Sequence, residues 1–146
     1  MNVLVLHGPS MNLMGIRSSR VGDRVTLDKI DTALRRKAHE LGITLKTLQT
    51  HDSGKAISFV QRNRNWAQGL LLSPGPWARF QHGLLDTLRW VEIPFVEIFF
   101  DAEFDPGQYS RDSLFKKLAI VTVTNQPIDA YVAALIQLHD HLTSGE

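Results

Sequence analysis

Residues suited to ligand binding and catalysis follow several short apolar runs of the sequence. The first such segment is the nine-residue loop HGPSMNLMG, residues 7–15, which ends in a glycine. It would bring backbone N–H groups and the short polar side chains of Ser10 and Asn12 toward the edge of a sheet. It is not a phosphate-binding P-loop, because the lysine and hydroxyl residue that close that motif are absent.

The next segment, RSSRVGDR at residues 17–24, carries three arginines and has no periodic apolar face. We interpret it as a mobile lid over the sheet edge. A guanidinium group donates two parallel hydrogen bonds to a carboxylate, so Arg17 suits an anionic substrate or a carboxylate from a neighbouring subunit. Solvated loop charges are the alternative, which the residues alone favour for Arg20 and Arg24.

Histidines and carboxylates offer further candidates. His51 and Asp52 could form an acid–base pair, but adjacent residues rarely point at one another. Asp52 or Ser53 serves equally as a helix cap, and we favour that role. A later group of carboxylates could hold a hard cation through its oxygens, but its spacing is not diagnostic, so we expect no metal. These carboxylates are Glu97, Asp101, Glu103 and Asp105.

Five short runs rich in leucine and β-branched residues predict the strands that position these loops. The runs are residues 3–6, 43–48, 70–72, 95–99 and 118–123. They alternate with amphipathic stretches, a pattern typical of parallel strands joined by crossover helices. The sequence therefore predicts an α/β doubly wound sheet, in which ligands bind beyond the carboxyl ends of the strands.

The helices of this arrangement have recognisable ends. The clearest begins after Thr26, which can cap it, and ends at Gly42. A second helix is predicted to start at Ser53, and a third to run through Leu84 until Pro94 stops it. Two more are predicted to start at Asp105-Pro106 and at Asn125 with Pro127.

Length and composition set the broad class. The 146 residues are 43% hydrophobic, which suits one domain spanning 1–146 with its own core. Lys and Arg total 16 against 15 Asp and Glu, so no nucleic-acid or membrane partner is expected. The chain has no cysteine, which rules out disulfides and thiolate chemistry. With no leader-like or membrane-length apolar segment, we expect a soluble, cytoplasmic protein.

Three motifs carry a family resemblance. HGPSMNLMG (7–15) resembles N-G-P-N-L-N-L-L-G, SPG (73–75) resembles N-P-G, and IPFVEI (93–98) resembles I-P-V-V-E-V of the type II 3-dehydroquinases. The spacing carries without a gap from the first strand to Tyr131. The resemblance implies a flavodoxin-like domain of a shikimate-pathway hydro-lyase, 3-dehydroquinate dehydratase. It also implies assembly as trimers arranged into a dodecamer, and no cofactor.

The residues that the resemblance makes catalytic are mostly replaced. Arg17 matches the family's lid arginine, but Gly22 stands at the place of the tyrosine that acts as base. Phe99 stands at the place of the histidine that acts as general acid, whereas the glutamate that orients that histidine remains as Glu97. Neither glycine nor phenylalanine has a side-chain proton to exchange.

The groups that hold the substrate in the family have changed as well. Ser73 and Arg79 replace an asparagine and a histidine, and Ser110 replaces a distal arginine. The carboxylate-binding serine and amides map to Phe100 and Asp101, where a carboxylate would repel the substrate unless it were turned away or paired with an arginine. Ser10 replaces an asparagine that positions a water molecule in the family. Asn12 and Asp86 match family positions directly.

Our leading hypothesis is a dehydroquinase-like protein with a repurposed strand-end pocket, which binds a small molecule or carries altered chemistry. Apolar residues such as Trp77, Phe99 and Phe100 would favour a ligand with a ring or hydrocarbon portion. The alternatives are an active dehydratase that uses substitute acid–base residues and a non-catalytic structural subunit. The possible substitutes are His7, His51 and Glu103.

Overall fold

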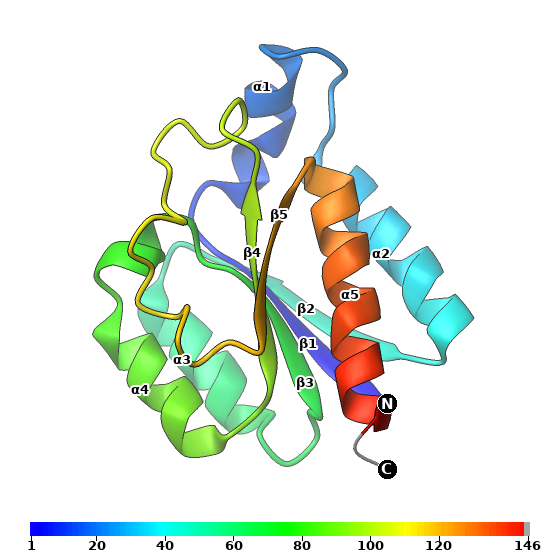
Figure 1. Ribbon diagram of the computed structural model, residues 1–146, viewed down its shortest axis with the longest axis vertical. Helices are drawn as coiled ribbons and strands as arrows, with labels where there is room; N and C mark the ends of the chain where they lie inside the picture. Colours follow the sequence, from blue (N-terminus) through cyan, green and yellow to red (C-terminus); the bar gives the residue numbers. More distant parts are fainter. Residues whose placement is uncertain (145–146) are drawn as a thin grey trace.

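A five-stranded parallel β-sheet lies at the centre of the computed structural model, which describes residues 1–144 (Figure 1). The strand order is β2-β1-β3-β4-β5, and all four pairings are parallel. The prediction of a flavodoxin-like doubly wound sheet is confirmed. The strands are β1 (Asn2–His7), β2 (Thr44–Gln49), β3 (Gly69–Ser73), β4 (Phe95–Phe100) and β5 (Val121–Asn125).

The first four strands begin within one residue of their predicted starts, whereas the fifth begins three residues later than predicted. Residues 118–120 precede β5 instead of opening it. The Leu118 N–H donates to the Phe115 carbonyl and the Ile120 N–H to the Phe95 carbonyl, so these residues close a turn onto the sheet. An apolar run alone does not separate such a turn from a strand.

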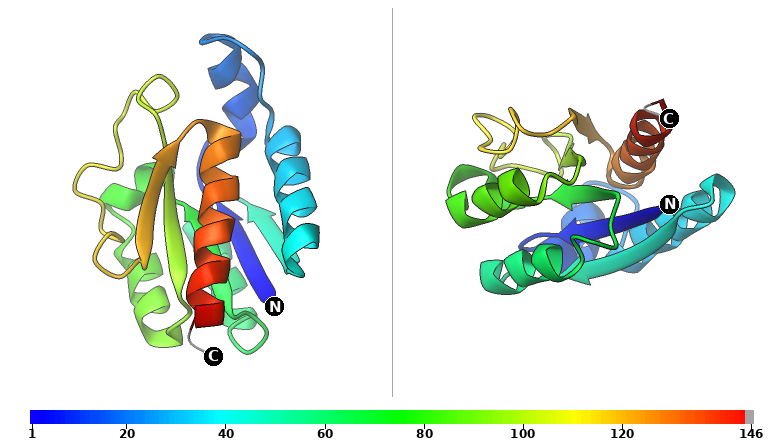
Figure 2. Two further views of the ribbon diagram at one scale, coloured as in Figure 1. Left: turned by 45° about the vertical axis from the view of Figure 1, so that its right-hand side comes forward. Right: turned by 90° about the horizontal axis from the view of Figure 1, so that it is seen from below.

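Helices cover both faces of the sheet, as predicted (Figures 1 and 2). Helices α2 (Leu27–Leu41) and α5 (Pro127–Ser144) pack together on one face, and α3 (Ser53–Arg62) and α4 (His82–Val91) on the other. The Thr26 side chain caps α2, and Gly42 ends it in a left-handed conformation, with φ at 69°. For α3 the cap is Asp52, whose Oδ1 accepts from the Gly54 and Lys55 amides, and not Ser53.

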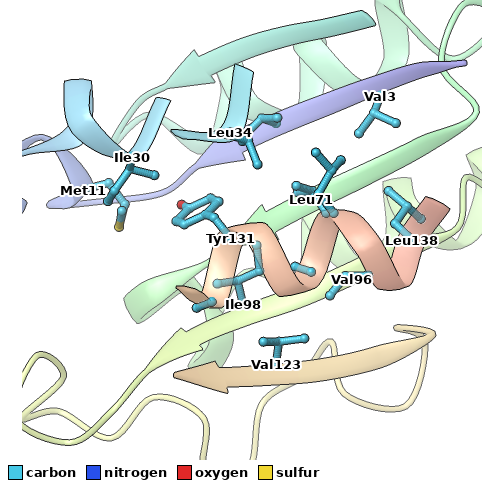
Figure 3. Close-up of a cluster of buried hydrophobic side chains, with 14 of the residues drawn as sticks. Val3, Met11, Ile30, Leu34, Leu71, Val96, Ile98, Val123, Tyr131 and Leu138 are labelled. Carbon is cyan, nitrogen blue, oxygen red and sulfur yellow. The ribbon is translucent and has the colours of Figure 1, made fainter. Parts of the chain in front are cut away.

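The strands alternate their side chains between two hydrophobic cores. Figure 3 shows the core on the α2 and α5 side, where Val3, Leu71 and Tyr131 are buried. Because side chains alternate along a strand, His7 and Ser73 face this same core at the ends of β1 and β3. Glu97 and Phe99 share the opposite face of β4.

The prediction of a helix starting at Asp105-Pro106 is wrong. Residues 101–120 form a series of turns between β4 and β5. Asp105 accepts a hydrogen bond from the Tyr109 amide through Oδ2, and Gln108 and Asp112 adopt positive φ values of 49° and 56°. Those backbone conformations cannot belong to a right-handed helix.

The segment interpreted as a mobile lid, residues 17–24, begins within a helix. A single 3₁₀ turn, η1 (Met11–Leu13), leads into α1 (Met14–Ser19), which stands at the carboxyl edge of the sheet (Figure 1). Met14 and Ser18, four residues apart, are both buried, and this short face was too brief to register as periodicity. No helix within residues 1–144 combines the length and the apolar character needed to cross a membrane.

Candidate functional site

A cavity of about 530 Å³ lies at the carboxyl ends of β3 and β4, between α1 and the turns that follow β4. This is the place where ligands bind in doubly wound sheets. Most of its wall is apolar, formed by Met11, Leu13, Ile16, Ile98, Phe99 and Phe100. Its polar lining side chains are Ser10, Arg17, Arg20, Ser73, Asp105 and Tyr109.

Arg17 projects from α1 into the wall of this cavity. One guanidinium nitrogen, Nη2, donates a hydrogen bond to the Phe104 carbonyl, which fixes the side chain against the turns after β4. Burial lowers the pKa of Arg17, while Asp105 and Tyr109 act in the opposite direction. A guanidinium remains charged in proteins, so Arg17 is a cation suited to an anionic group in the cavity.

Asp105 is the one carboxylate among the described residues that line the cavity, and its charge interacts with that of Arg17. Its residue is only 5% exposed, and burial raises its pKa, against the effects of the Tyr109 amide, Arg17 and Arg79. From the sequence, Asp105 was named as a helix start and as one of four carboxylates that could hold a cation, whereas Tyr109 was not singled out. No local pattern places either residue in the cavity, because the turns after β4 bring them there.

The structure separates the residues expected at the site. Ser10, Arg17, Ser73 and Phe100 line the cavity, and so does Arg20, for which a solvated role was favoured. Asn12 and His51 are exposed and do not line it. Arg79 is also exposed; its Nη2 donates to the Gln108 carbonyl at 2.8 Å, and the guanidinium lies 5.8 Å from the Tyr109 ring centroid.

The acidic residues do not form one cluster. Asp101 and Glu103 both accept hydrogen bonds from Gln126 Nε2, at 2.9 and 2.8 Å, outside the cavity lining. The Asp101 carboxylate is thus turned away and held by an amide instead of an arginine. Within residues 1–144, no three histidine or carboxylate side chains come together in a way that could hold a metal ion.

The two positions that differ most from the resemblance lie apart. The Phe99 ring forms part of the cavity wall and is 2% exposed. Gly22 is exposed and does not line the cavity; a Cβ atom there would meet nothing within 4 Å. Glu97 accepts hydrogen bonds from the Ser113 and Thr122 hydroxyls, and burial raises its pKa.

Beneath the cavity floor, His7 joins a chain of polar side chains. Its Nδ1 lies 2.6 Å from the Tyr131 hydroxyl, and its Nε2 lies 2.9 Å from Asp31 Oδ1. The Tyr131 hydroxyl is in turn 2.5 Å from Ser73 Oγ. Sequence reasoning placed His7 and Ser73 at strand ends but missed Asp31 and Tyr131, since hydrogen bonds across 24 and 124 residues leave no local signal.

Comparisons with known proteins agree on the family. The family model for class II dehydroquinases matches residues 1–139. A 3-dehydroquinate dehydratase from Dictyoglomus turgidum is 27% identical over 91% of this chain and 92% of its own length. Another from Carboxydothermus hydrogenoformans is 29% identical over 97% of this chain and 92% of its own.

Solved structures show the same fold. A type II dehydroquinase from Butyrivibrio crossotus superposes with a TM-score of 0.84 at 20% identity, covering 94% of this chain and 97% of that one. A 3-dehydroquinate dehydratase-like protein from Bifidobacterium longum gives a TM-score of 0.64 at 19% identity, covering 99% and 98%. With the strand order, the cavity at the carboxyl edge and the family match over nearly its whole length, the chain belongs to the class II dehydroquinase family.

Proposed function

We propose that this member of the family uses its cavity to bind a small molecule with an apolar portion and an anionic group, and has little or no 3-dehydroquinate dehydratase activity. The observation that carries the proposal is the Phe99 ring in the cavity wall, at the position where the resemblance places the general acid. We place this function in the cytoplasm, in line with the composition.

The character of the cavity supports this ligand class. Apolar side chains form most of its wall, and two of them, Leu13 and Ile16, are 44% and 52% exposed. Burial of a ring or hydrocarbon against such walls contributes roughly 25 cal/mol per Å² of apolar surface. Arg17 and Arg20 supply the positive charge that binds an acidic group. Asp105 lines the same cavity, and its carboxylate offsets part of this positive charge.

The anion site of the resemblance is altered as well. The Asp101 amide, which maps to that site, donates to the Asn125 carbonyl at 3.0 Å and is therefore engaged in the sheet. A positioned acid or base each typically contributes about a hundred- to ten-thousandfold in rate, so the loss of both removes most of the family reaction.

The first experiment measures conversion of 3-dehydroquinate by its ultraviolet absorbance at high protein concentration. We expect no turnover by the natural chain and at most a trace by the double variant Gly22→Tyr with Phe99→His, because residue 22 does not line the cavity and the anion site is altered. The control is Gly22→Ala with Phe99→Leu, which changes both positions without supplying an acid or base. Robust conversion by the natural chain would favour the second candidate, an active dehydratase, which the family match over residues 1–139 makes the natural rival.

The second experiment tests binding directly. Aromatic and alicyclic carboxylates are screened by thermal shift against their uncharged methyl esters, and we expect the acids to stabilise the protein more. Hydrogen bonds to a charged group are worth about 1.5–3 kcal/mol, so Arg17→Ala should weaken binding by roughly 10- to 150-fold. Arg24→Ala is the matched control, because Arg24 is exposed and does not line the cavity.

A further inference from the structure

Four polar side chains link the surface of α2 to the cavity floor through the core. They run from Asp31 to His7, Tyr131 and Ser73, with separations of 2.9, 2.6 and 2.5 Å. His7 and Tyr131 are fully buried, and Ser73 is 2% exposed and lines the cavity. The Asp31 side chain retains 21% of its exposure, so the outer end of the chain meets solvent.

The donor and acceptor capacities of these groups give the chain a direction. The Asp31 carboxylate can only accept, so His7 Nε2 carries a proton and donates to it. In the neutral ring Nδ1 is then an acceptor, which takes the Tyr131 proton, and Tyr131 can accept from Ser73. Toward the cavity Ser73 is left with lone pairs.

Protonation of His7 reverses this order. Nδ1 then donates to the Tyr131 oxygen, the Tyr131 proton points to Ser73, and the Ser73 hydroxyl proton is free to face the cavity. The same serine therefore accepts from a ligand when His7 is neutral and donates to it when His7 is charged.

We propose that Asp31, His7, Tyr131 and Ser73 form a proton relay whose cavity end, Ser73, exchanges a proton with a hydroxyl or carbonyl oxygen of the bound ligand. This proposal rests on the proposed function, because the relay can exchange a proton with a ligand only if the cavity binds one. It adds acid–base chemistry at a position other than Gly22 and Phe99.

Each step of the relay conserves protons and charge. When Ser73 acts as base, the ligand O–H proton passes to Ser73 Oγ as the Ser73 proton passes to Tyr131 and the Tyr131 proton to His7 Nδ1. The ligand becomes an oxyanion, and the imidazolium is balanced by Asp31. The reverse sequence delivers a proton to a carbonyl oxygen or a departing hydroxyl.

The surroundings of His7 suit a reservoir for that proton. The titratable groups that contact its ring are Asp31 on α2 and Tyr131 on α5, and Arg17 on α1 acts on Tyr131 through space. Burial raises the pKa of Tyr131, so the phenol passes protons on without holding a negative charge. A purely structural network would keep its hydrogen bonds without altering reactivity in the cavity.

The first test is nitrogen NMR of the histidine rings in the intact chain. With His7 neutral, we expect a protonated Nε2 and an unprotonated Nδ1. Ser73→Ala and Tyr131→Phe should each change the titration of His7, although within residues 1–144 Ser73 is joined to the ring only through Tyr131 in the chain of hydrogen bonds. A neutral His7 that carries its proton on Nδ1, or a titration identical in Ser73→Ala, would overturn the proposed direction.

The second test uses a fluorophosphonate probe, which forms an Oγ–P bond with an activated serine as the P–F bond breaks and fluoride leaves. The Ser73 proton must pass along the relay, so labelling of Ser73, located by mass spectrometry, should quicken as His7 loses its proton. Tyr131→Phe and His7→Asn should slow labelling at least about a hundredfold and flatten the pH profile. Asparagine at residue 7 is the residue of the resembling family motif, and circular dichroism checks the fold.

A matched pair of variants on α2 completes this test. Asp31→Asn should slow labelling and displace the pH profile, whereas Asp28→Asn, exposed on the same helix, should leave both unchanged. An unlabelled Ser73, or equal rates in the natural chain and Tyr131→Phe, would refute the relay even if carboxylates bind. If the relay variants slow labelling of Ser73 as predicted but the protein binds no carboxylate, the proposed ligand class is refuted and the relay is supported.

Discussion

Glu97 and Phe99 point from the same face of β4, yet they have different surroundings. The Glu97 carboxylate is fully buried and forms no salt bridge within residues 1–144. It is satisfied by the Ser113 and Thr122 hydroxyls, so it holds the turns after β4 and the strand β5 against the sheet. The residue that orients an acid in the resemblance therefore has a structural task here.

The buried carboxyl makes stability depend on pH. Because burial raises the pKa of Glu97 in the folded chain, the folded state holds its proton over a range of pH in which the unfolded state has lost it. The contribution of the protonated Glu97 to the free energy of unfolding is complete below its ordinary pKa of 4.5. It is lost as pH rises through the raised pKa of Glu97 in the folded state. Relative to Glu97→Gln, the natural chain should therefore become less stable as pH rises through this window.

Urea unfolding at a series of pH values checks this prediction. Glu92→Gln serves as the control, since Glu92 is exposed at the end of α4. A difference in unfolding free energy between the natural chain and Glu97→Gln that stayed constant across the window would contradict it.

At the scale of elements, α1 is held to the loop that follows it by one buried hydroxyl. Ser18 Oγ accepts from the Val25 amide at 2.7 Å and lies 2.7 Å from the Met14 carbonyl, to which it can donate. It thereby closes residues 19–25 onto the helix that carries Arg17 and borders the cavity.

We predict that Ser18→Ala destabilises the chain by about 0.5–1.5 kcal/mol, because the half-buried Val25 amide loses its acceptor. Carboxylate binding should weaken too, since Arg17 and Arg20 depend on this helix. Ser19→Ala is the matched control: Ser19 is exposed and bonds only to the Ile16 carbonyl. Chemical denaturation and hydrogen exchange at the Val25 amide measure the effect, and equal stability of the two variants would disprove it.

The sequence predicted the elements whose determinants are local. Thr26 and Gly42 mark both ends of α2 through a cap and a left-handed residue, and each acts within a few residues of itself. The turns at residues 101–120 escaped prediction because their path is set by distant partners, such as the Ala78 carbonyl that accepts from Leu114.

The candidate site divides in the same way. Ser10, Arg17, Ser73 and Phe100 were found because strand ends and family motifs point to one edge of the sheet. Asp105 and Tyr109 reach the cavity along an irregular path, and Asp31 and Tyr131 join His7 only after α2 and α5 have packed on one face. Such contacts between residues distant in the sequence depend on tertiary packing, which no single segment determines.

At the scale of the whole molecule, the cavity is formed by η1, α1, the carboxyl ends of β3 and β4 and the turns that follow β4. Asp86, which matches a family position, lies away from the cavity; its side chain is 63% exposed and sits 3.6 Å from Arg89. Assembly as trimers and a dodecamer, and a purely structural subunit role, stay predictions.

We predict that ligand affinity does not change with protein concentration, even where the chain associates, because Arg17 and Arg20, which we propose hold the anionic group, line the cavity of a single chain. Light scattering across a dilution series gives the assembly size, and calorimetry or fluorescence with the best carboxylate from the thermal-shift screen gives Kd at each concentration. Asp86→Asn should leave Kd unchanged, whereas Arg17→Ala should raise it at every assembly size. An affinity that rose as the assembly formed would contradict this prediction and show that binding is coupled to association, through a group contributed by a second copy or through a change of the cavity on assembly.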